Sequence, residues 1–454
     1  MSNQNLFNEF SEVSPKQWKQ KIQFDLKGDD YNEKLVWESP EGIKVKPFYT
    51  VEDLEEIPFS QVQINTWHIA QTIFVSNAER ANLKALTILK KGIESLIFII
   101  PTNEVDCSIL LKNIDLQTVN IHFEFQFLAS EYIKKLYEIE KEHKACFYYN
   151  FDIINHLAKS GNWYHNQETD FKLFSEIVAH CNNITIDASN YQNSGANITQ
   201  QLAYTLAHAN EYLNRIPESR LTEIKFNFKI AVGSNYFFEI AKIKALRLLW
   251  TSLAPEYNCN TNCHIISIPS RRNKTIYDCN SNMLRTTTEC MSAILGGTNT
   301  ICNLPYDAIY HKNNDFAEQI ARNQLLLLKE ESYFDKTTNA SDGSYYITSI
   351  TNQLAEKALE LFKLLEKSGG FLSQLKNHAI QKKIKESAKK EQELFNTQNE
   401  VLIGINKYAS PLDKMKDAIE IYPFTKNKPR KSILEPIIES RLAEEIEQKR
   451  LDDE

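Results

Sequence analysis

The side chains that could do chemistry are scattered along this chain rather than gathered into a motif. There is no G-x-S-x-G nucleophile turn, no phosphate-binding P-loop and no H-E-x-x-H metal motif. The nearest approach to a metal-ligand spacing is Cys259, Cys263 and His264, a C-x3-C-H segment without the second pair that a zinc site needs. We interpret that spacing as incidental, and a lone histidine such as His208 as either a surface residue or a satisfied one.

Cations are the second group with possible chemistry. Arg271, Arg272 and Lys274 stand together, and they either hold an anionic ligand or form a solvated loop; we favour the loop. Arg285 and Arg322 could contact an anion, but structural pairing explains them equally well. The chain as a whole carries 52 Lys and Arg against 59 Asp and Glu, for a formal net charge of −7. This balance argues against a nucleic-acid binder that relies on a general basic field.

The elements that must position these residues follow a repeating pattern. Helical patterns separate short runs rich in apolar and β-branched residues, and in the helical segment 236–252 the apolar positions recur every three or four residues. Alternating strands and helices predict parallel pairing with right-handed crossovers. Seven or eight such units, without a G-x-G-x-x-G segment, favour a (β/α)8 TIM barrel over an open doubly wound sheet. The predicted strands are 95–100, 119–125, 146–149, 183–188, 224–232, 264–268 and 300–304.

Several of these strands alternate apolar and polar residues, which is unusual for parallel strands covered on both faces. If the apolar set packs on the helices, the polar set points down the barrel axis. Glu124, Asp187, Lys225 and Lys229 would then form a self-satisfied charge network or line a channel for a ligand. The alternative is that some of these strands are antiparallel or edge strands with one face in water.

The composition divides the chain into three parts. We predict an extended N-terminal arm over 1–75, with Trp18 and Trp37, a barrel over 76–370, and a helical C-terminal linker segment over 371–454. The start of the chain lacks the features of a secretory signal, and no apolar run could cross a membrane. With eight cysteines and no C-x-x-C, we expect a cytoplasmic protein with reduced thiols.

From about residue 14 onward the chain resembles the small (beta) subunit of methylmalonyl-CoA mutase, an adenosylcobalamin-dependent isomerase. Ordered matches over most of the chain carry this resemblance, and the most specific are the stretches Trp37-x4-Gly42-Ile43, Gly195-Ala196, Asn235-Tyr236-Phe237-Phe238-Glu239, Asn282-Met283-Leu284-Arg285-Thr286-Thr287, Gly343-Ser344-Tyr345-Tyr346 and Leu402-Ile403-Gly404-Ile405-Asn406-Lys407-Tyr408. The resemblance implies a TIM barrel threaded by CoA in the catalytic subunit, and an arm that wraps a partner subunit.

Departures from the family pattern fall at its functional positions. The catalytic subunit has a Tyr-His pair where this chain has Ser189 and Asn190, and an amide cannot supply a transferable proton. The family's W-x-I-R-Q-Y segment aligns with Trp67 to Thr72, so that its CoA-contacting arginine and its active-site tyrosine become Ala70 and Thr72. Two further anion-binding arginines align with Lys172 and with a position near His264.

The family's cobalamin-binding domain carries a D-x-H-x-x-G motif, and that motif does not occur in this sequence. We therefore expect no cobalamin-binding domain, no metal and no cofactor bound by this chain, with adenosylcobalamin held by the large, catalytic partner subunit. The resemblance implies a non-catalytic subunit that stabilises this partner in a heterodimer, while the partner interconverts methylmalonyl-CoA and succinyl-CoA. The alternatives are a barrel that still binds a CoA ester or is an active isomerase, and a free-standing homodimeric scaffold.

Overall fold

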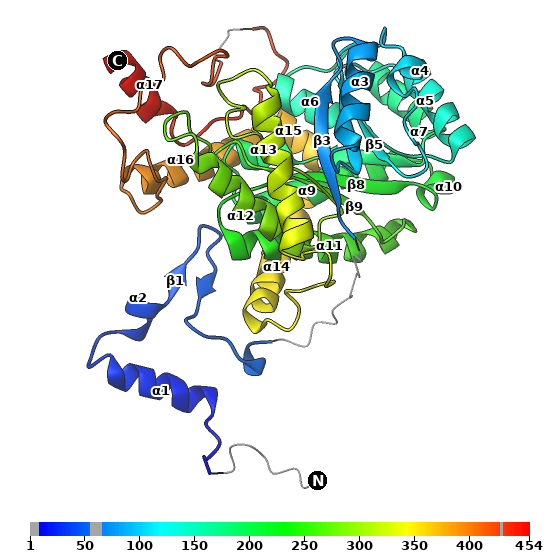
Figure 1. Cartoon of the computed structure of the whole chain (residues 1–454). Helices are drawn as coiled ribbons and strands as arrows, with labels where there is room; N and C mark the ends of the chain where they lie inside the picture. Colours follow the sequence, from blue (N-terminus) through cyan, green and yellow to red (C-terminus); the bar gives the residue numbers. More distant parts are fainter. Residues whose placement is uncertain (1–8, 55–65, 427–429) are drawn as a thin grey trace, which may run out of the picture.

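A computed structural model describes residues 9–54, 66–426 and 430–454 (Figure 1). Its centre is one sheet of eight parallel strands in the order β6-β5-β4-β3-β10-β9-β8-β7. The last strand in sequence, β10, pairs with the first, β3, so that the sheet curls back on itself as a TIM barrel requires. The strands are β3 (His68–Phe74), β4 (Ser95–Ile100), β5 (Asn120–Phe125), β6 (Cys146–Asn150), β7 (Asn183–Asp187), β8 (Lys225–Val232), β9 (His264–Pro269) and β10 (Thr300–Cys302).

The seam between β6 and β7 is joined by a side chain rather than by a backbone ladder. The Asn183 amide donates to the Phe147 carbonyl at 2.7 Å and accepts from the Tyr149 N–H at 3.1 Å. One asparagine therefore satisfies a donor and an acceptor that a neighbouring strand would otherwise satisfy. The barrel is closed all the way round.

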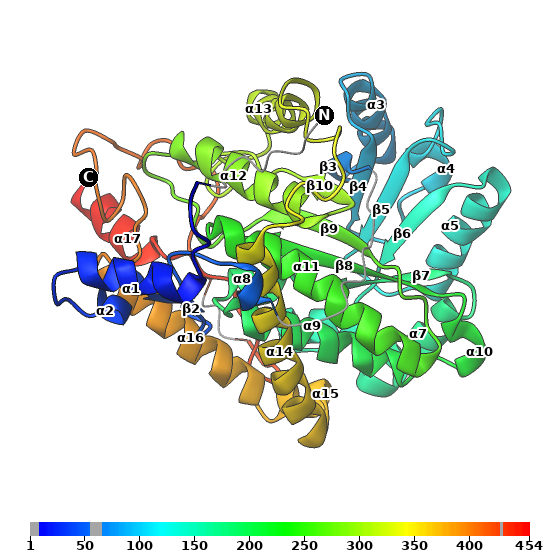
Figure 2. The ribbon, with the colours of Figure 1, turned by 90° about the horizontal axis from the view of Figure 1, so that it is seen from below.

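Helices surround the strands (Figure 2). Apolar residues from alternate strand positions, such as Phe98, Phe123 and Phe228, are fully buried between the sheet and these helices. The helices that follow the barrel strands are α3 (Ala78–Leu89), α4 (Cys107–Leu110), α5 (Ser130–His143), α6 (Ile153–Ser160), α7 (Gln167–Val178), α8 (Ser189–Asn193), α9 (Ile198–Leu213), α10 (Glu218–Leu221), α11 (Tyr236–Leu253), α12 (Ser281–Gly296) and α13 (Asp315–Leu326). Two short helical turns, η2 (Ala254–Tyr257) and η3 (Leu327–Glu331), lie among them. No helix in the described ranges is long and apolar enough to cross a membrane.

The sequence-based elements match this architecture, with one omission. All seven predicted strands form, all pair in parallel, and the alternative of antiparallel or edge strands is wrong. The eighth strand, β3, lies within residues 1–75, which we assigned to the arm. Its apolar and polar residues alternate only briefly in HIAQTIF, so the local pattern does not mark it as a barrel strand.

The C-terminal part begins with α14 (Tyr345–Lys367), α15 (Phe371–Lys376) and α16 (Ala379–Asn396). Gly369 and Gly370 follow α14 with φ angles of +102° and +85°, in a region that favours glycine, and they separate α14 from α15. Beyond α16 the chain returns over the carboxyl ends of the barrel strands and finishes in α17 (Glu444–Asp453). We call residues 430–443 the C-terminal strap, because Ile437 donates its N–H to Ala158 and Leu442 donates to Arg272 across the barrel loops.

The N-terminal arm covers residues 9–54, and its first part projects from the barrel in Figure 1. It contains α1 (Pro15–Asp25), α2 (Tyr31–Leu35), the hairpin of β1 (Trp37–Glu38) and β2 (Lys44–Val45), and the turn η1 (Val51–Asp53). The hairpin region is attached to the body: Ile43 is buried and the Trp37 ring lies edge-on to Phe238 at 5.7 Å. Helix α1 buries none of its residues.

Candidate functional site

The barrel axis is where this fold would hold a substrate or exclude one. The polar positions of the alternating strands do face the axis, as predicted. In the half toward the carboxyl ends of the strands, which we call the upper axis, Lys229 on β8 contacts Glu124 on β5 at 2.5 Å and Asp187 on β7 at 3.4 Å. The predicted charge network therefore forms from three of its four residues.

The fourth residue, Lys225, does not join this network, so that part of the prediction is wrong. It lies at the start of β8 and is exposed at the opposite, amino-terminal mouth of the barrel. Four residues of extended chain place it about 13 Å from Lys229 along the strand. Lys225 points to the same face of β8 as Lys229, but it lies at a different height along the barrel axis.

Within the charged trio of Glu124, Asp187 and Lys229, the aspartate and the lysine favour each other's charged form. Burial alone would lower the pKa of Lys229, but Asp187 and Glu124 raise it well above its usual value. Burial alone would raise the pKa of Asp187, yet the Lys229 ammonium brings the net shift downward. Each charge is thus compensated inside the barrel, as buried charges must be.

Asp187 is also anchored by a buried hydrogen-bond network. Its backbone N–H donates to Asp152 Oδ2 at 2.9 Å, and Asp152 Oδ1 lies 2.9 Å from His208 Nε2. The Tyr212 hydroxyl donates to the same Asp152 oxygen at 2.7 Å, and the other ring nitrogen of His208 lies 3.0 Å from the hydroxyl of Tyr191. His208 is therefore a satisfied core residue, the second of the two alternatives that the sequence left open.

The half of the axis toward the amino ends of the strands, the lower axis, is filled by rings. His122 and Tyr148 stack at 4.3 Å between centroids, and Tyr148 lies 4.3 Å from His264. Burial lowers the pKa of His122 to about 3 and that of His264 well below its usual value, with the neighbouring cations and histidines adding to the effect. These imidazoles are neutral in the folded protein at physiological pH.

Two separate cavities open along the axis. The upper one, of about 310 Å³, is lined by Ala70, Thr72, Glu124 and Lys229 among others. The lower one, of about 510 Å³, is lined by the starts of the strands and includes Tyr148 and His264. No residue lines both cavities, so the charged trio and the stacked rings stand between them.

The structure gathers some of the predicted site residues and disperses others. Ala70 and Thr72 face the upper axis, where Thr72 Oγ1 lies 3.3 Å from Cys302 Sγ. Ser189 donates its hydroxyl to Asp187 at 2.5 Å, while His264 lies in the lower axis. Lys172 is on the outer helix α7, and it contributes nothing to the axis.

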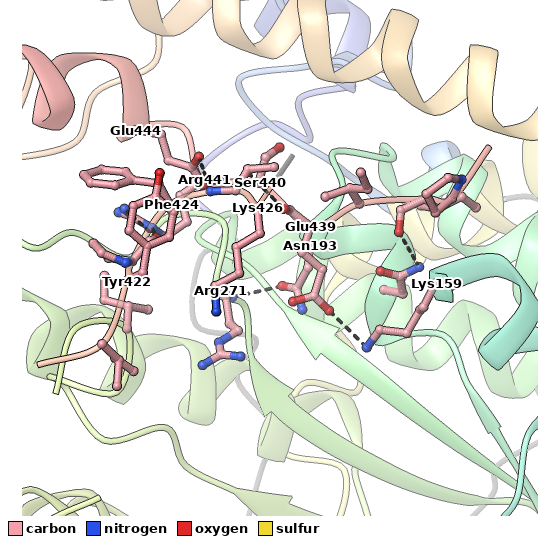
Figure 3. Close-up of a pocket in the computed structure, with 18 of the residues that line it drawn as sticks. Lys159, Asn193, Arg271, Tyr422, Phe424, Lys426, Glu439, Ser440, Arg441 and Glu444 are labelled. Carbon is pink, nitrogen blue, oxygen red and sulfur yellow. Dashed lines mark hydrogen bonds and ion pairs between the residues drawn. The ribbon is translucent and has the colours of Figure 1, made fainter. Parts of the chain in front are cut away.

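Asn190 is covered by the C-terminal strap. Its side-chain amide donates to the Ile437 carbonyl at 3.3 Å, and it is fully buried. Beside it, a cleft of about 850 Å³ opens between the C-terminal region and the barrel loops (Figure 3). Asn190, which we aligned with a histidine of the family, is thus engaged by the chain's own backbone.

The cationic segment after β9 is mostly internal, so our preference for a solvated loop is wrong for two of its three residues. Arg272 is buried against Glu391 and the strap, and Lys274 is buried in an ion pair with Glu289 at 2.8 Å. Only Arg271 is exposed, and it lines the cleft. Tertiary contacts from distant helices, invisible in the local sequence, provide the counter-charges.

Arg285 and Arg322 make structural contacts. Arg285 donates to Thr275, Asn282 and the carbonyl of Ile403, and Arg322 donates to Gln71. These contacts match the structural alternative that we gave for both arginines. They tie helices α12 and α13 to neighbouring segments.

Cys259, Cys263 and His264 do not form a metal site. Cys263 lies against Arg247, while His264 contacts Thr300 inside the barrel. Among the residues that the structure describes, no group of three or more His, Cys, Asp or Glu side chains is arranged to hold a metal ion.

Sequence reasoning missed Tyr148 and Asp152. Tyr148 lies between Phe147 and Tyr149, which face outward. The predicted strand 146–149 contains this alternation, but it is too short to show which residues face the axis. Asp152 meets His208 and Tyr212 from far along the chain, and no spacing rule predicts that contact.

Comparisons with known proteins identify a family and several relatives of this chain. The family model described as methylmalonyl-CoA mutase matches residues 101–452. A methylmalonyl-CoA mutase small subunit from Porphyromonas gingivalis is 36% identical over 98% of this chain and 78% of its own length. A methylmalonyl-CoA mutase from Rhizobium meliloti is 28% identical over 86% of this chain, which covers only 63% of that relative. Among solved structures, dihydropteroate synthase from Thermus thermophilus aligns over 58% of this chain and 95% of its own, with 11% identity and a TM-score of 0.32.

Proposed function

Because the chain belongs to the methylmalonyl-CoA mutase family, we propose that it is the non-catalytic small subunit of a two-subunit methylmalonyl-CoA mutase. In this proposal a large subunit binds adenosylcobalamin and interconverts methylmalonyl-CoA and succinyl-CoA. The present chain stabilises that partner in a heterodimer. A cytoplasmic location accords with its eight free cysteine thiols.

The observation that carries the proposal is the Lys229 trio across the upper axis. A thioester threaded through the barrel would have to displace Lys229 from both Glu124 and Asp187. Breaking a buried ion pair by removing one partner costs about 3–5 kcal/mol. An occupied axis therefore favours a structural role over substrate binding.

The side chains at the family's functional positions support the same conclusion. Ala70 and Thr72 present a methyl group and a hydroxyl to the upper axis, and neither can hold an anionic group as an arginine does. Asn190 has no transferable proton, and its amide is already bound to Ile437. The barrel thus lacks an acid, a base and an anion clamp at the positions where the family would place them.

The residues above the barrel do not fit adenosylcobalamin as we infer the family holds it. Cobalt needs a ligand such as a histidine with a free ring nitrogen facing the corrin, and none of the residues lining the large cleft is a histidine. His208 is held between Asp152 and Tyr191, and His264 lies in the lower axis. We derive no reaction step through the cofactor in this chain.

The N-terminal arm is the proposed site of contact with the large subunit. Trp18 and Phe24 on α1 are 57% and 77% exposed, and Phe10 and Val13 expose further apolar surface beside them. An arm whose first part projects from its own barrel and presents aromatic side chains is typical of a segment buried against a partner.

The test is to purify the chain alone and together with the large subunit of a two-subunit mutase. We expect a stable complex with isomerase activity, and no activity of the chain alone with methylmalonyl-CoA and added adenosylcobalamin. Activity of the chain alone would overturn the non-catalytic role. In the double variant Trp18→Ser and Phe24→Ser, the complex should dissociate while the thermal unfolding of the isolated chain is unchanged. Replacing the exposed Leu364 by Ser, on α14 within the body, is the matched control.

One observation favours a second candidate, binding of a CoA ester without turnover. The lower cavity is large enough for part of such a ligand and exposes Lys225 at its rim. Calorimetry with CoA esters distinguishes this candidate, because a purely structural subunit gives no saturable heat. A stable homodimer that ignores the large subunit would instead indicate a free-standing scaffold.

A further inference from the structure

The cleft beside the C-terminal strap has a charge that the rest of the chain does not share. It measures about 850 Å³ and lies over the carboxyl ends of the barrel strands, between the segment from Ile421 to Lys426, the strap and the loop after β9 (Figure 3). The cations among its described lining residues are Lys159, Arg271, Lys426, Arg430 and Arg441, and the carboxylates are Glu439 and Glu444. A chain of net charge −7 thus concentrates an excess of three positive charges in one cleft.

Three of these cations are engaged by the protein itself. Lys159 pairs with Glu439 at 3.3 Å, Arg441 pairs with Glu447 at 2.6 Å, and Arg430 donates to the Ser160 carbonyl at 2.6 Å. Their positive charge is partly or wholly compensated. They shape the cleft more than they attract a ligand.

Arg271 and Lys426 are different. The Arg271 guanidinium makes a single long contact, 3.5 Å, to the Ala308 carbonyl, and no described residue pairs with the Lys426 ammonium. Both side chains are exposed and both line the cleft. Two cations that share a cleft without carboxylate partners repel each other unless an anion lies between them.

An exposed aromatic ring stands in the same cleft. Tyr422 is 58% exposed and lies edge-on to Phe424 at 5.5 Å, so one partner fixes the ring while much of its surface stays open. Planar rings such as nucleobases stack on such surfaces. Cations and an open aromatic ring together match a ligand that carries both phosphates and a flat base.

We propose that this cleft binds a nucleoside polyphosphate, with its phosphates between Arg271 and Lys426 and its base on Tyr422. The volume lies within the range of about 300–1,000 Å³ that is typical of small-molecule sites. Guanidinium and ammonium groups are the usual phosphate partners in proteins. Arg271 also lines the upper-axis cavity, so the cleft adjoins the upper mouth of the barrel. The cleft shares no lining residue with the proposed contact of the N-terminal arm with the large subunit.

The experiment is calorimetric titration of the full chain with ATP, with inorganic triphosphate and with adenosine. ATP should bind saturably and more tightly than triphosphate, and the affinity should fall as salt increases. Adenosine should bind more weakly than both. Absence of saturable ATP binding would overturn the proposal.

Three variants assign the contacts. Arg271→Gln and Lys426→Gln should each weaken both ATP and triphosphate by about tenfold or more, because each removes a charged hydrogen-bond partner. Tyr422→Ala should weaken ATP but leave triphosphate unchanged. Lys390→Gln, at an exposed position on α16 away from the cleft, is the matched control and should bind like the wild type.

Two results would contradict the assignment. If Lys390→Gln weakens ATP as much as Lys426→Gln does, the binding is a general charge effect. If ATP and triphosphate bind equally and Tyr422→Ala changes neither, the cleft takes a free polyphosphate and not a nucleotide. All four variants replace exposed side chains, so their folding is checked by unchanged thermal unfolding.

Discussion

The upper and lower halves of the barrel axis are lined by alternate residues of the same strands, yet their buried polar side chains are accommodated in different ways. The upper half holds three charges that compensate one another, Glu124, Asp187 and Lys229. The lower half holds neutral rings, and both ring nitrogens of His122 lack a hydrogen-bond partner in the described structure.

The difference shows that an enclosed axis can be filled in two ways. Charges near the upper mouth are stable only as a complete set, since removing one leaves the others buried and unpaired. Rings in the lower half stay neutral because burial disfavours their charged form. The two halves should therefore respond to different perturbations, the upper to charge removal and the lower to acid.

The largest expected effect comes from Lys229→Met. It leaves Glu124 and Asp187 without a counter-ion, and we expect a loss of about 3–5 kcal/mol in the free energy of unfolding, measured by denaturant titration. Lys225→Met is the matched control on the same strand and face, and because Lys225 is exposed we expect a change within about 0.5 kcal/mol.

If Lys229→Met does not fold, the triple variant with Glu124→Gln and Asp187→Asn keeps the prediction testable. Removing all three charges should recover most of the lost stability. Equal losses in Lys229→Met and Lys225→Met would show that the trio is not a coupled unit.

A smaller effect is expected at the seam of the lower half. Asn183→Ala removes the amide that joins β6 to β7 and leaves the Phe147 carbonyl and the Tyr149 N–H unpaired. We expect a loss of about 2 kcal/mol, because an unsatisfied buried polar group costs about 1–3 kcal/mol. The rate of amide hydrogen exchange at Tyr149 should increase in the same variant.

The neighbouring Asn182→Ala is the control for that measurement, since Asn182 is exposed. Unchanged protection of Tyr149 in Asn183→Ala would show that the seam is closed by other contacts.

The smallest effect at neutral pH is expected for His122→Phe. Phenylalanine keeps the stack on Tyr148 and needs no hydrogen bond, so stability at pH 7 should be unchanged within about 1 kcal/mol or slightly higher. Below the ordinary histidine pKa of about 6.5, however, the unfolded chain binds a proton at His122 that the folded chain binds only near pH 3.

Stability of the wild type should therefore rise with pH between about 3 and 6.5, with each such histidine contributing a slope of about 1.4 kcal/mol per pH unit. His122→Phe should remove one such contribution, measured as unfolding free energy against pH. Replacing the exposed His180 by Phe is the control and should keep the wild-type slope. Identical slopes in wild type and His122→Phe would place the acid sensitivity elsewhere.

Much of the fold could be predicted from local pattern. Alternation in 119–125 and 224–232 is dictated by the two-residue period of a strand, and it correctly assigned Phe123 and Phe228 to the helix-facing core. Strand β3 was missed because its alternation is short and because we assigned residues 1–75 to the arm. Local reasoning works where the periodicity is long enough to separate two faces.

The candidate site was less accessible to that reasoning. Arg272 and Lys274 resemble a solvated loop in sequence because their partners, Glu391 and Glu289, are separated from them along the chain. The cleft itself needs the C-terminal region to return over the barrel. Contacts between segments far apart in sequence leave no periodic signal.

The sequence by itself determined seven of the eight strands, a barrel of seven or eight units and the polar character of its axis, because side-chain direction along a strand follows from backbone geometry alone. Only the tertiary structure decided which charges meet. Lys225 and Lys229 hold equivalent positions in the alternating pattern of the strand. The height along the barrel axis at which each side chain lies depends on how the strands are staggered around the closed barrel. That stagger brings Lys229 to Glu124 and Asp187 and leaves Lys225 in water.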